Sequence, residues 1–264
     1  MSLFLTMSGQ RQLAYTLSGA AERPLVVMVH PLGMNQQVWQ DMQQALVADH
    51  QVVSLDLPGH GRSSPYPAGQ ALSIEQLGAD VVALIKHLGR PSCHYVGTSI
   101  GGAIGMSLLL NHPELIETAT LTNTATKIGT TEAWLARAAA VRAQGLGALA
   151  ETFVPRWFAP AFVQQQPAVI ADWVAQLQNV DDESYAQLCE ALATFDASEA
   201  CAGLTQRVDL IAGSDDVAMP AATMVANAQL FQQVRLTQLA VGHVPSVEDA
   251  AAFLAVLEPI LNGQ

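Results

Sequence analysis

Short apolar runs rich in β-branched residues alternate with helical patterns along most of the chain, and this alternation limits the fold more than any other feature. Six runs have the length of a strand, at residues 25–29, 52–55, 93–96, 118–121, 208–211 and 234–236. Helical periodicity lies at residues 38–47, 74–88, 104–110, 224–230 and 250–261. Such alternation predicts an α/β protein with a mostly parallel sheet flanked by helices. Residues 2–6 and 12–17 add an antiparallel opening hairpin, which makes eight strands.

The alternation stops between residues 124 and 200, where Ala-, Gln- and Glu-rich helical stretches are interrupted by Pro155, Pro160 and Pro167. We expect a helical cap here, inserted after the sixth strand and placed over the carboxyl ends of the strands, where open α/β sheets bind ligands. The 264 residues suit a single α/β unit. The predicted division is therefore a core of residues 1–123 and 201–264 with a cap of residues 124–200.

Composition excludes several classes of protein. Half of the residues are apolar, which rules out a disordered chain, and the net charge of −12 argues against binding to nucleic acid. Three cysteines without a CxxC spacing indicate neither a disulfide framework nor a zinc site, and they suit a reducing compartment. The first residues lack the pattern of a signal peptide, and no stretch resembles a membrane span. We predict a cytoplasmic protein without a membrane partner, and a homo-oligomer is compatible with this sequence.

A G-x-S-x-G pentapeptide, residues 97–101, directly follows a predicted strand and precedes a helix. Small residues on both sides of Ser99 allow a sharp strand-to-helix turn that exposes its hydroxyl, as a nucleophile requires. The alternative is a glycine-rich phosphate-binding turn, but the complete phosphate-binding patterns are absent. Ser99 is therefore the candidate nucleophile.

A nucleophilic serine needs a base, and the base needs an orienting acid. His243 follows the last predicted strand and is the candidate base, whereas His94 and His112 have positions typical of structural histidines. The acid is expected after the strand 208–211, where two carboxylates are adjacent. The spacing to the preceding glycine and the following proline favours Asp216, with Asp215 as the alternative.

An oxyanion hole needs two backbone N–H groups directed at the developing negative charge. Ile100, which follows the nucleophile, supplies one candidate. The loop after the strand 25–29 supplies the other, and Leu32 is favoured because Pro31 has no N–H. We interpret His30 as a structural residue of this loop. Residues 56–63 are interpreted as an organised surface turn rather than a metal site, since one Asp and one His are too few ligands.

Together these motifs resemble the α/β-hydrolase superfamily across nearly the whole chain. The resemblance rests on residues 30–33, 59–63, 97–101, 213–220 and 242–243. It implies the α/β-hydrolase fold and a serine hydrolase that uses a Ser99–His243–Asp216 triad. The fold alone says little about the substrate, because it hosts many chemistries.

The predicted cap resembles that of the 3-oxoadipate enol-lactonase group, on residues 123–130, Trp134, Arg137 and 156–162. This resemblance implies an enzyme that opens a lactone in the β-ketoadipate route of aromatic catabolism, with Trp134 and Arg137 facing the substrate. The two residues are three apart, so a helix places them on one face. A guanidinium beside an indole suits a small carboxylate with an apolar body. The alternative is that Trp134 belongs to the cap core and Arg137 to a solvated face.

The basic residues are concentrated in the same part of the chain. Four of the eleven lie between residues 124 and 160 against two acidic residues, a local charge of +2, while the rest of the chain carries −14. A locally positive cap can favour an anionic substrate even on an acidic protein, since salt screens distant charges. We therefore expect a small-molecule lactone or ester, anionic in character, as the partner.

The predicted reaction is hydrolysis through an acyl-enzyme, without a metal or an organic cofactor. Three alternatives stay open. The first is a carboxylesterase or lactonase of broad specificity with the same triad. The second is a hydrolase of carbon–carbon bonds or a lyase, because the triad does not decide which bond is broken. The third is a ligand-binding protein that has kept the fold without catalysis.

Overall fold

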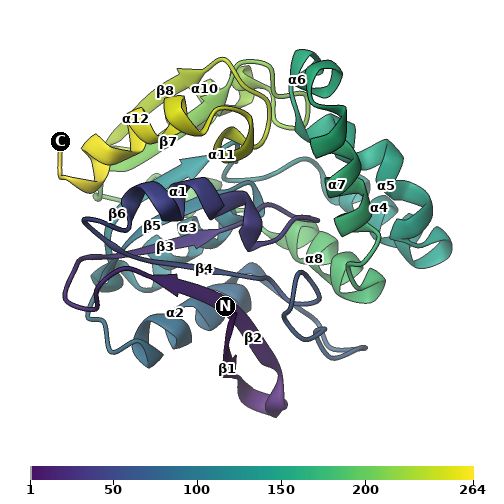
Figure 1. The fold of residues 1–264 in the computed structure, drawn as a ribbon, viewed down its shortest axis with the longest axis horizontal. Helices are drawn as coiled ribbons and strands as arrows, with labels where there is room; N and C mark the ends of the chain where they lie inside the picture. Colours follow the sequence, from purple (N-terminus) through teal and green to yellow (C-terminus); the bar gives the residue numbers. More distant parts are fainter. Residues whose placement is uncertain (1) are drawn as a thin grey trace.

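The computed structural model describes residues 2–264 and contains one eight-stranded sheet with helices on both faces (Figure 1). The strands are β1 (Leu3–Thr6), β2 (Gln12–Ser18), β3 (Leu25–Val29), β4 (Gln51–Leu55), β5 (Cys93–Thr98), β6 (Ile116–Thr122), β7 (Val208–Gly213) and β8 (Val234–Leu239). Their spatial order is β1-β2-β4-β3-β5-β6-β7-β8. The β1–β2 and β2–β4 pairs are antiparallel, and all other pairs are parallel. The predicted hairpin and mostly parallel sheet are confirmed.

Helices cover both faces of this sheet. They are α1 (Gln40–Leu46), α2 (Ile74–His87), α3 (Ile100–Asn111), α10 (Ala221–Ala228), α11 (Pro245–Glu248) and α12 (Ala250–Leu261), with short 3₁₀ turns at Ser8–Gln10, Gln36–Trp39 and Pro113–Leu115. Helices α1 and α12 pack together on one face, and α2 and α3 pack together on the other (Figure 1). A capping box formed by Ser73 and Gln76 starts α2.

Helix α3 begins at Ile100, four residues before the predicted start. Three glycines in its first two turns lower the intrinsic helix propensity, so the apolar pattern becomes recognisable only after them. Every residue from Ile100 to Leu109 is buried. Tertiary packing rather than propensity therefore forms this part of the helix.

The segment between β6 and β7 is helical, as predicted for an insertion after the sixth strand. It contains α4 (Thr131–Gln144), α5 (Leu146–Phe153), a 3₁₀ turn at Val154–Trp157, α6 (Pro160–Gln165), α7 (Pro167–Leu177), α8 (Asp182–Thr194) and α9 (Ser198–Cys201). Helices α4 and α8 pack against each other, and the group lies at one end of the sheet (Figure 1). The exact division at residues 124 and 200 stays a prediction.

The turn at residues 56–63 is organised, as predicted, but only Gly61 and Arg62 of it are exposed, so most of the turn does not lie on the surface. Asp56 and His60 are 1% and 0% exposed. The amide of Asp181 donates to the carbonyl of Gly59 at 3.0 Å, and the His60 ring stacks on the Tyr185 ring of α8 with centroids 6.2 Å apart. The cap helix covers the turn, and this long-range packing leaves no local signal in the sequence.

Candidate active site

Ser99 occupies the sharp turn between β5 and α3. Its backbone has φ +58° and ψ −115°, a conformation that residues other than glycine rarely adopt. A Cβ atom at position 97 would lie 2.3 Å from the carbonyl oxygen of Gly101, so only glycine fits there. The turn places the Ser99 side chain at the floor of a cavity of about 190 Å³.

Asp216 and His243 are paired beside this serine. The Nδ1 atom of His243 lies 2.6 Å from Oδ2 of Asp216, and both side chains are buried. The other carboxylate oxygen of Asp216 accepts the amides of Ala218 and Met219 at 2.7 and 2.8 Å. Asp215, the alternative acid, is exposed. The structure therefore brings Asp216, rather than its neighbour, to the predicted base.

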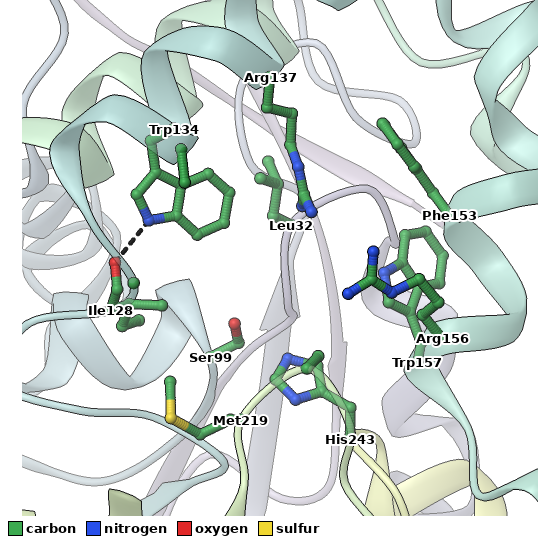
Figure 2. A pocket seen from close by; sticks show the side chains of 13 residues that line it. Leu32, Ser99, Ile128, Trp134, Arg137, Phe153, Arg156, Trp157, Met219 and His243 are labelled. Carbon is green, nitrogen blue, oxygen red and sulfur yellow. Dashed lines mark hydrogen bonds between the residues drawn. The ribbon is translucent and has the colours of Figure 1, made fainter.

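Ser99 and His243 face the same cavity (Figure 2). No hydrogen bond joins the two side chains among the residues drawn there. Hydrogen bonds between catalytic groups are often long without a substrate and shorten when it binds. The arrangement is therefore compatible with proton transfer from the serine to the imidazole.

The loop after β3 brings Leu32 to the rim of the cavity. Pro31 has no N–H, and the amide of Gly33 donates to Nε2 of His60 at 3.1 Å. Leu32 therefore stays the candidate donor of this loop, because Pro31 has no N–H and the amide of Gly33 is already bound. Ile100 is the first residue of α3, and the first N–H groups of a helix have no partner within the helix. The two predicted oxyanion donors thus come from the loop after β3 and from the first residue of α3.

Two neutral histidines hold this loop in place. Burial lowers the pKa of His30 to about 4, and burial together with the nearby His30 lowers the pKa of His60 to about 3. The Nε2 atom of His30 accepts the amide of Leu57 at 2.9 Å, and its Nδ1 lies 2.8 Å from the carbonyl of Pro31. The proton of His30 is therefore assigned to Nδ1. The predicted structural role of His30 is confirmed.

Aromatic side chains of the cap form the wall opposite Ser99 (Figure 2). The guanidinium of Arg137 lies between the rings of Trp134 and Phe153, 4.9 Å from each centroid. The indole N–H of Trp134 donates to the carbonyl of Ile128 at 2.5 Å, which fixes the ring. Trp134 and Arg137 thus both line the cavity, as the resemblance implied, and Arg137 is not on a solvated face.

Comparison with known proteins decides the family. Residues 24–160, more than half of the chain, match the family model described as the alpha/beta hydrolase fold. The chain belongs to the α/β hydrolase family.

Two relatives of this α/β hydrolase, and one solved structure that is similar to it, are named enol-lactonases. The chain is 35% identical to 3-oxoadipate enol-lactonase 2 of Acinetobacter baylyi, over 95% of this chain and 93% of that protein. It is 28% identical to 3-oxoadipate enol-lactonase 1 of the same organism, over 97% and 95% of the two chains. The crystal structure of the enol-lactonase from Burkholderia xenovorans LB400 superposes with a TM-score of 0.93 at 31% identity, and covers 98% of this chain and 100% of that one. The predicted α/β-hydrolase fold and hydrolase class are confirmed.

The sequence predicted a locally positive cap, but in the folded α/β hydrolase acidic residues neutralise two of its four basic side chains. Lys127 pairs with Asp196 at 3.1 Å, and Arg142 is bound by Glu183 and Glu190 of α8. These acidic partners lie outside the residues counted in the prediction, so counting along the chain overstated the positive charge. The cations that line the cavity are Arg137 and Arg156.

Sequence reasoning missed the residues that hold the base loop. The backbone N–H of His243 donates to the carbonyl of Trp157 at 2.9 Å, and the carboxylate of Glu248 accepts the amide of Ala159 at 2.9 Å. Burial and the nearby Asp216 charge raise the pKa of Glu248. A Glu five residues after a candidate base is too common to identify such a role from one sequence.

Neither a metal cluster nor a membrane-spanning helix is found in residues 2–264. No three His, Cys, Asp or Glu side chains in this range are grouped as ligands for a metal ion. The helices described are also too short or too polar to cross a bilayer.

Proposed function

We propose that this α/β hydrolase opens a small lactone that carries a carboxylate, and that the substrate is 3-oxoadipate enol-lactone. The observation that carries the proposal is the guanidinium of Arg137, fixed between two rings across the cavity from Ser99. A cation in that position can pair with the carboxylate of a substrate whose carbonyl reaches the serine. The names of the enol-lactonase relatives support the same substrate.

Acylation begins when His243 accepts the hydroxyl proton of Ser99, whose oxygen attacks the lactone carbonyl. Negative charge develops on the carbonyl oxygen and is stabilised by the amides of Leu32 and Ile100, each donor contributing about 3–4 kcal/mol. The ring carbon–oxygen bond then breaks. The enol oxygen takes the proton from His243 and stays on the opened chain, and the whole molecule is now joined to Ser99 as an ester.

Deacylation repeats these steps with water. His243 accepts a proton from the water, which attacks the ester carbonyl, and the same two amides stabilise the charge. Ser99 leaves and recovers its proton from the imidazolium. Asp216 keeps the proton of the neutral imidazole on Nδ1 and stabilises the cation formed in each half-reaction. The released enol converts to the ketone, 3-oxoadipate.

The proposed setting is the cytoplasm, in the β-ketoadipate route of aromatic catabolism. Cys93, Cys189 and Cys201 are free and buried, and burial raises the pKa of each thiol. Free thiols suit a reducing compartment.

The deciding experiment compares kcat/KM for 3-oxoadipate enol-lactone with kcat/KM for phenyl acetate, which has no carboxylate. We expect a preference for the lactone of at least about 10-fold, the effect of one charge-assisted hydrogen bond. The methyl ester of the lactone is the matched control, because it keeps the ring and removes the anion. A preference for phenyl acetate would instead indicate a carboxylesterase of broad specificity.

A further inference from the structure

Asn123 directly follows β6, at the point where the chain leaves the sheet for the cap, and its side chain is fully buried. Its Nδ2 donates to the carbonyls of Gly242 and His243 at 3.0 and 2.9 Å. Its Oδ1 accepts the amide of Gly213, the last residue of β7, at 2.7 Å. One side chain thus joins the strand that precedes Asp216 to the loop that carries His243.

The two segments joined by Asn123 approach unusually closely. A Cβ atom on Gly213 would lie 2.1 Å from the carbonyl oxygen of Gly242, so no larger residue fits. The amide of Asp215 also donates to the carbonyl of Val241 at 3.0 Å. The contact between the Asp216 carboxylate and the His243 imidazole lies just beyond the place where these two segments meet. A small change in the distance between the segments would therefore move the acid relative to the base.

The residues on either side of Asn123 contact the third segment, the turn with Ser99. The amide of Ser99 donates to the carbonyl of Thr122 at 2.9 Å, and the hydroxyl of Thr124 donates to the carbonyl of Ser99 at 2.8 Å. Residues 122–124 therefore touch the segments of the proposed nucleophile, acid and base. The backbone at Asn123 has φ +48°, a conformation that asparagine tolerates better than most residues.

We propose that Asn123 is a positioning residue that fixes the Asp216 and His243 segments relative to each other and to Ser99. The inference rests on the triad of the proposed function. An amide suits this position because it donates to two carbonyls and accepts one N–H, whereas a carboxylate can only accept. The side chain does not line the substrate cavity, so its effect is expected in the chemical step and not in binding.

Two variants distinguish the effect of the Asn123 side-chain hydrogen bonds from the effect of its backbone conformation. Asn123→Gly keeps the positive φ accessible and removes the three hydrogen bonds, and Asn123→Asp keeps the size but removes both donors. Thr120→Val is the matched control on β6, because the buried hydroxyl of Thr120 has no partner within residues 2–264. The wild type, the variants and Ser99→Ala are assayed on phenyl acetate and labelled with a fluorophosphonate, which counts active sites.

Per active site, we expect kcat to fall about 100-fold in Asn123→Gly, the typical effect of a misplacement near 1 Å, with KM within about twofold. A kcat per active site within twofold of wild type, or a change confined to KM, would overturn the inference while leaving the triad intact. If Ser99→Ala keeps its activity, the triad itself is wrong and the inference falls with it.

Discussion

The floor of the cavity and the cap wall above it are held by different interactions. The floor, formed by Ser99, Asp216, His243 and the loop of Leu32, is fixed by directional hydrogen bonds between buried groups. The cap wall, formed by Trp134, Arg137, Phe153, Arg156 and Trp157, centres on a guanidinium packed between two rings.

This difference separates chemistry from recognition. A proton transfer or an attack on a carbonyl loses much of its rate when the groups move by about 1 Å. A cation between aromatic rings is attracted over a broad range of positions, at about 0.5–2 kcal/mol per ring. The floor is therefore suited to one reaction on many esters, whereas changes in the cap wall can alter the preferred ester without disturbing the reaction.

The two regions nevertheless meet at the loop of His243. The backbone N–H of His243 donates to the carbonyl of Trp157 in the cap, and Glu248 binds the amide of Ala159. The proposed base is thus anchored partly to the cap. Substitutions in the floor should therefore alter mainly kcat, and substitutions in the cap wall should alter mainly KM.

The largest effect is expected from Ser99→Ala, which removes the proposed nucleophile. We expect kcat to fall by at least about 10⁴-fold on both the lactone and phenyl acetate, because the remaining oxyanion donors supply only part of the catalysis. Thermal unfolding should be little changed. Retention of fluorophosphonate labelling by this variant would show that another residue is the nucleophile.

Asp216→Asn should come close to that loss, with kcat reduced about 10⁴-fold. The Ala218 and Met219 amides require an acceptor, so the NH₂ of the new asparagine faces Nδ1 of His243 and forces its proton onto Nε2. The imidazole then cannot accept the serine proton. Asp215→Asn is the matched control, and kcat within twofold of wild type is expected since this side chain is exposed. A larger loss of kcat in Asp215→Asn than in Asp216→Asn would mean that Asp215 is the acid that orients His243.

In the cap wall, Arg137→Ala should lower kcat/KM for the enol-lactone about 10- to 100-fold, mainly through KM, because a charge-assisted contact with the carboxylate is lost. The value for phenyl acetate should stay within about twofold. Arg142→Ala is the matched control on the same helix, because Arg142 pairs with Glu183 and Glu190 away from the cavity. Equal losses on both substrates would mean that the cap wall also controls the chemical step.

The free energy of unfolding should depend on pH because of two buried histidines that hold the loop of Leu32. His30 and His60 have lowered pKa values in the folded state, about 4 and about 3. Below pH 6.5 these two histidines bind protons in the unfolded chain but stay neutral in the folded chain. The free energy of unfolding therefore falls as the pH drops. From pH 7.5 to 5.5 we expect a loss of about 1 kcal/mol per histidine. Urea unfolding of wild type and His60→Gln should give a shallower decline for the variant. An equal decline of the unfolding free energy with pH in both proteins would mean that His60 does not contribute to the pH dependence.

Site residues could be predicted from the sequence where the geometry depends only on neighbouring residues in the chain. Glycine at 97 and 101 around Ser99 and the spacing around Asp216 follow from local steric needs, so these residues could be named in advance. The burial of Asp56 and His60 depends on a helix more than a hundred residues later, and the pairing of Arg142 depends on acidic residues of α8. The role proposed for Asn123 depends on three segments that only the folded sheet brings together.

The insertion of the cap also has a consequence for how the chain is made. Strand β6 ends at Thr122, and its neighbour β7 begins only at Val208. During synthesis, which runs from the N-terminus, the edge of β6 stays unpaired until the whole cap has left the ribosome. An exposed apolar edge invites pairing with other chains, so a chain stalled within the cap is prone to aggregate. Since Asp216 and His243 come later still, the proposed reaction is available only to a finished chain.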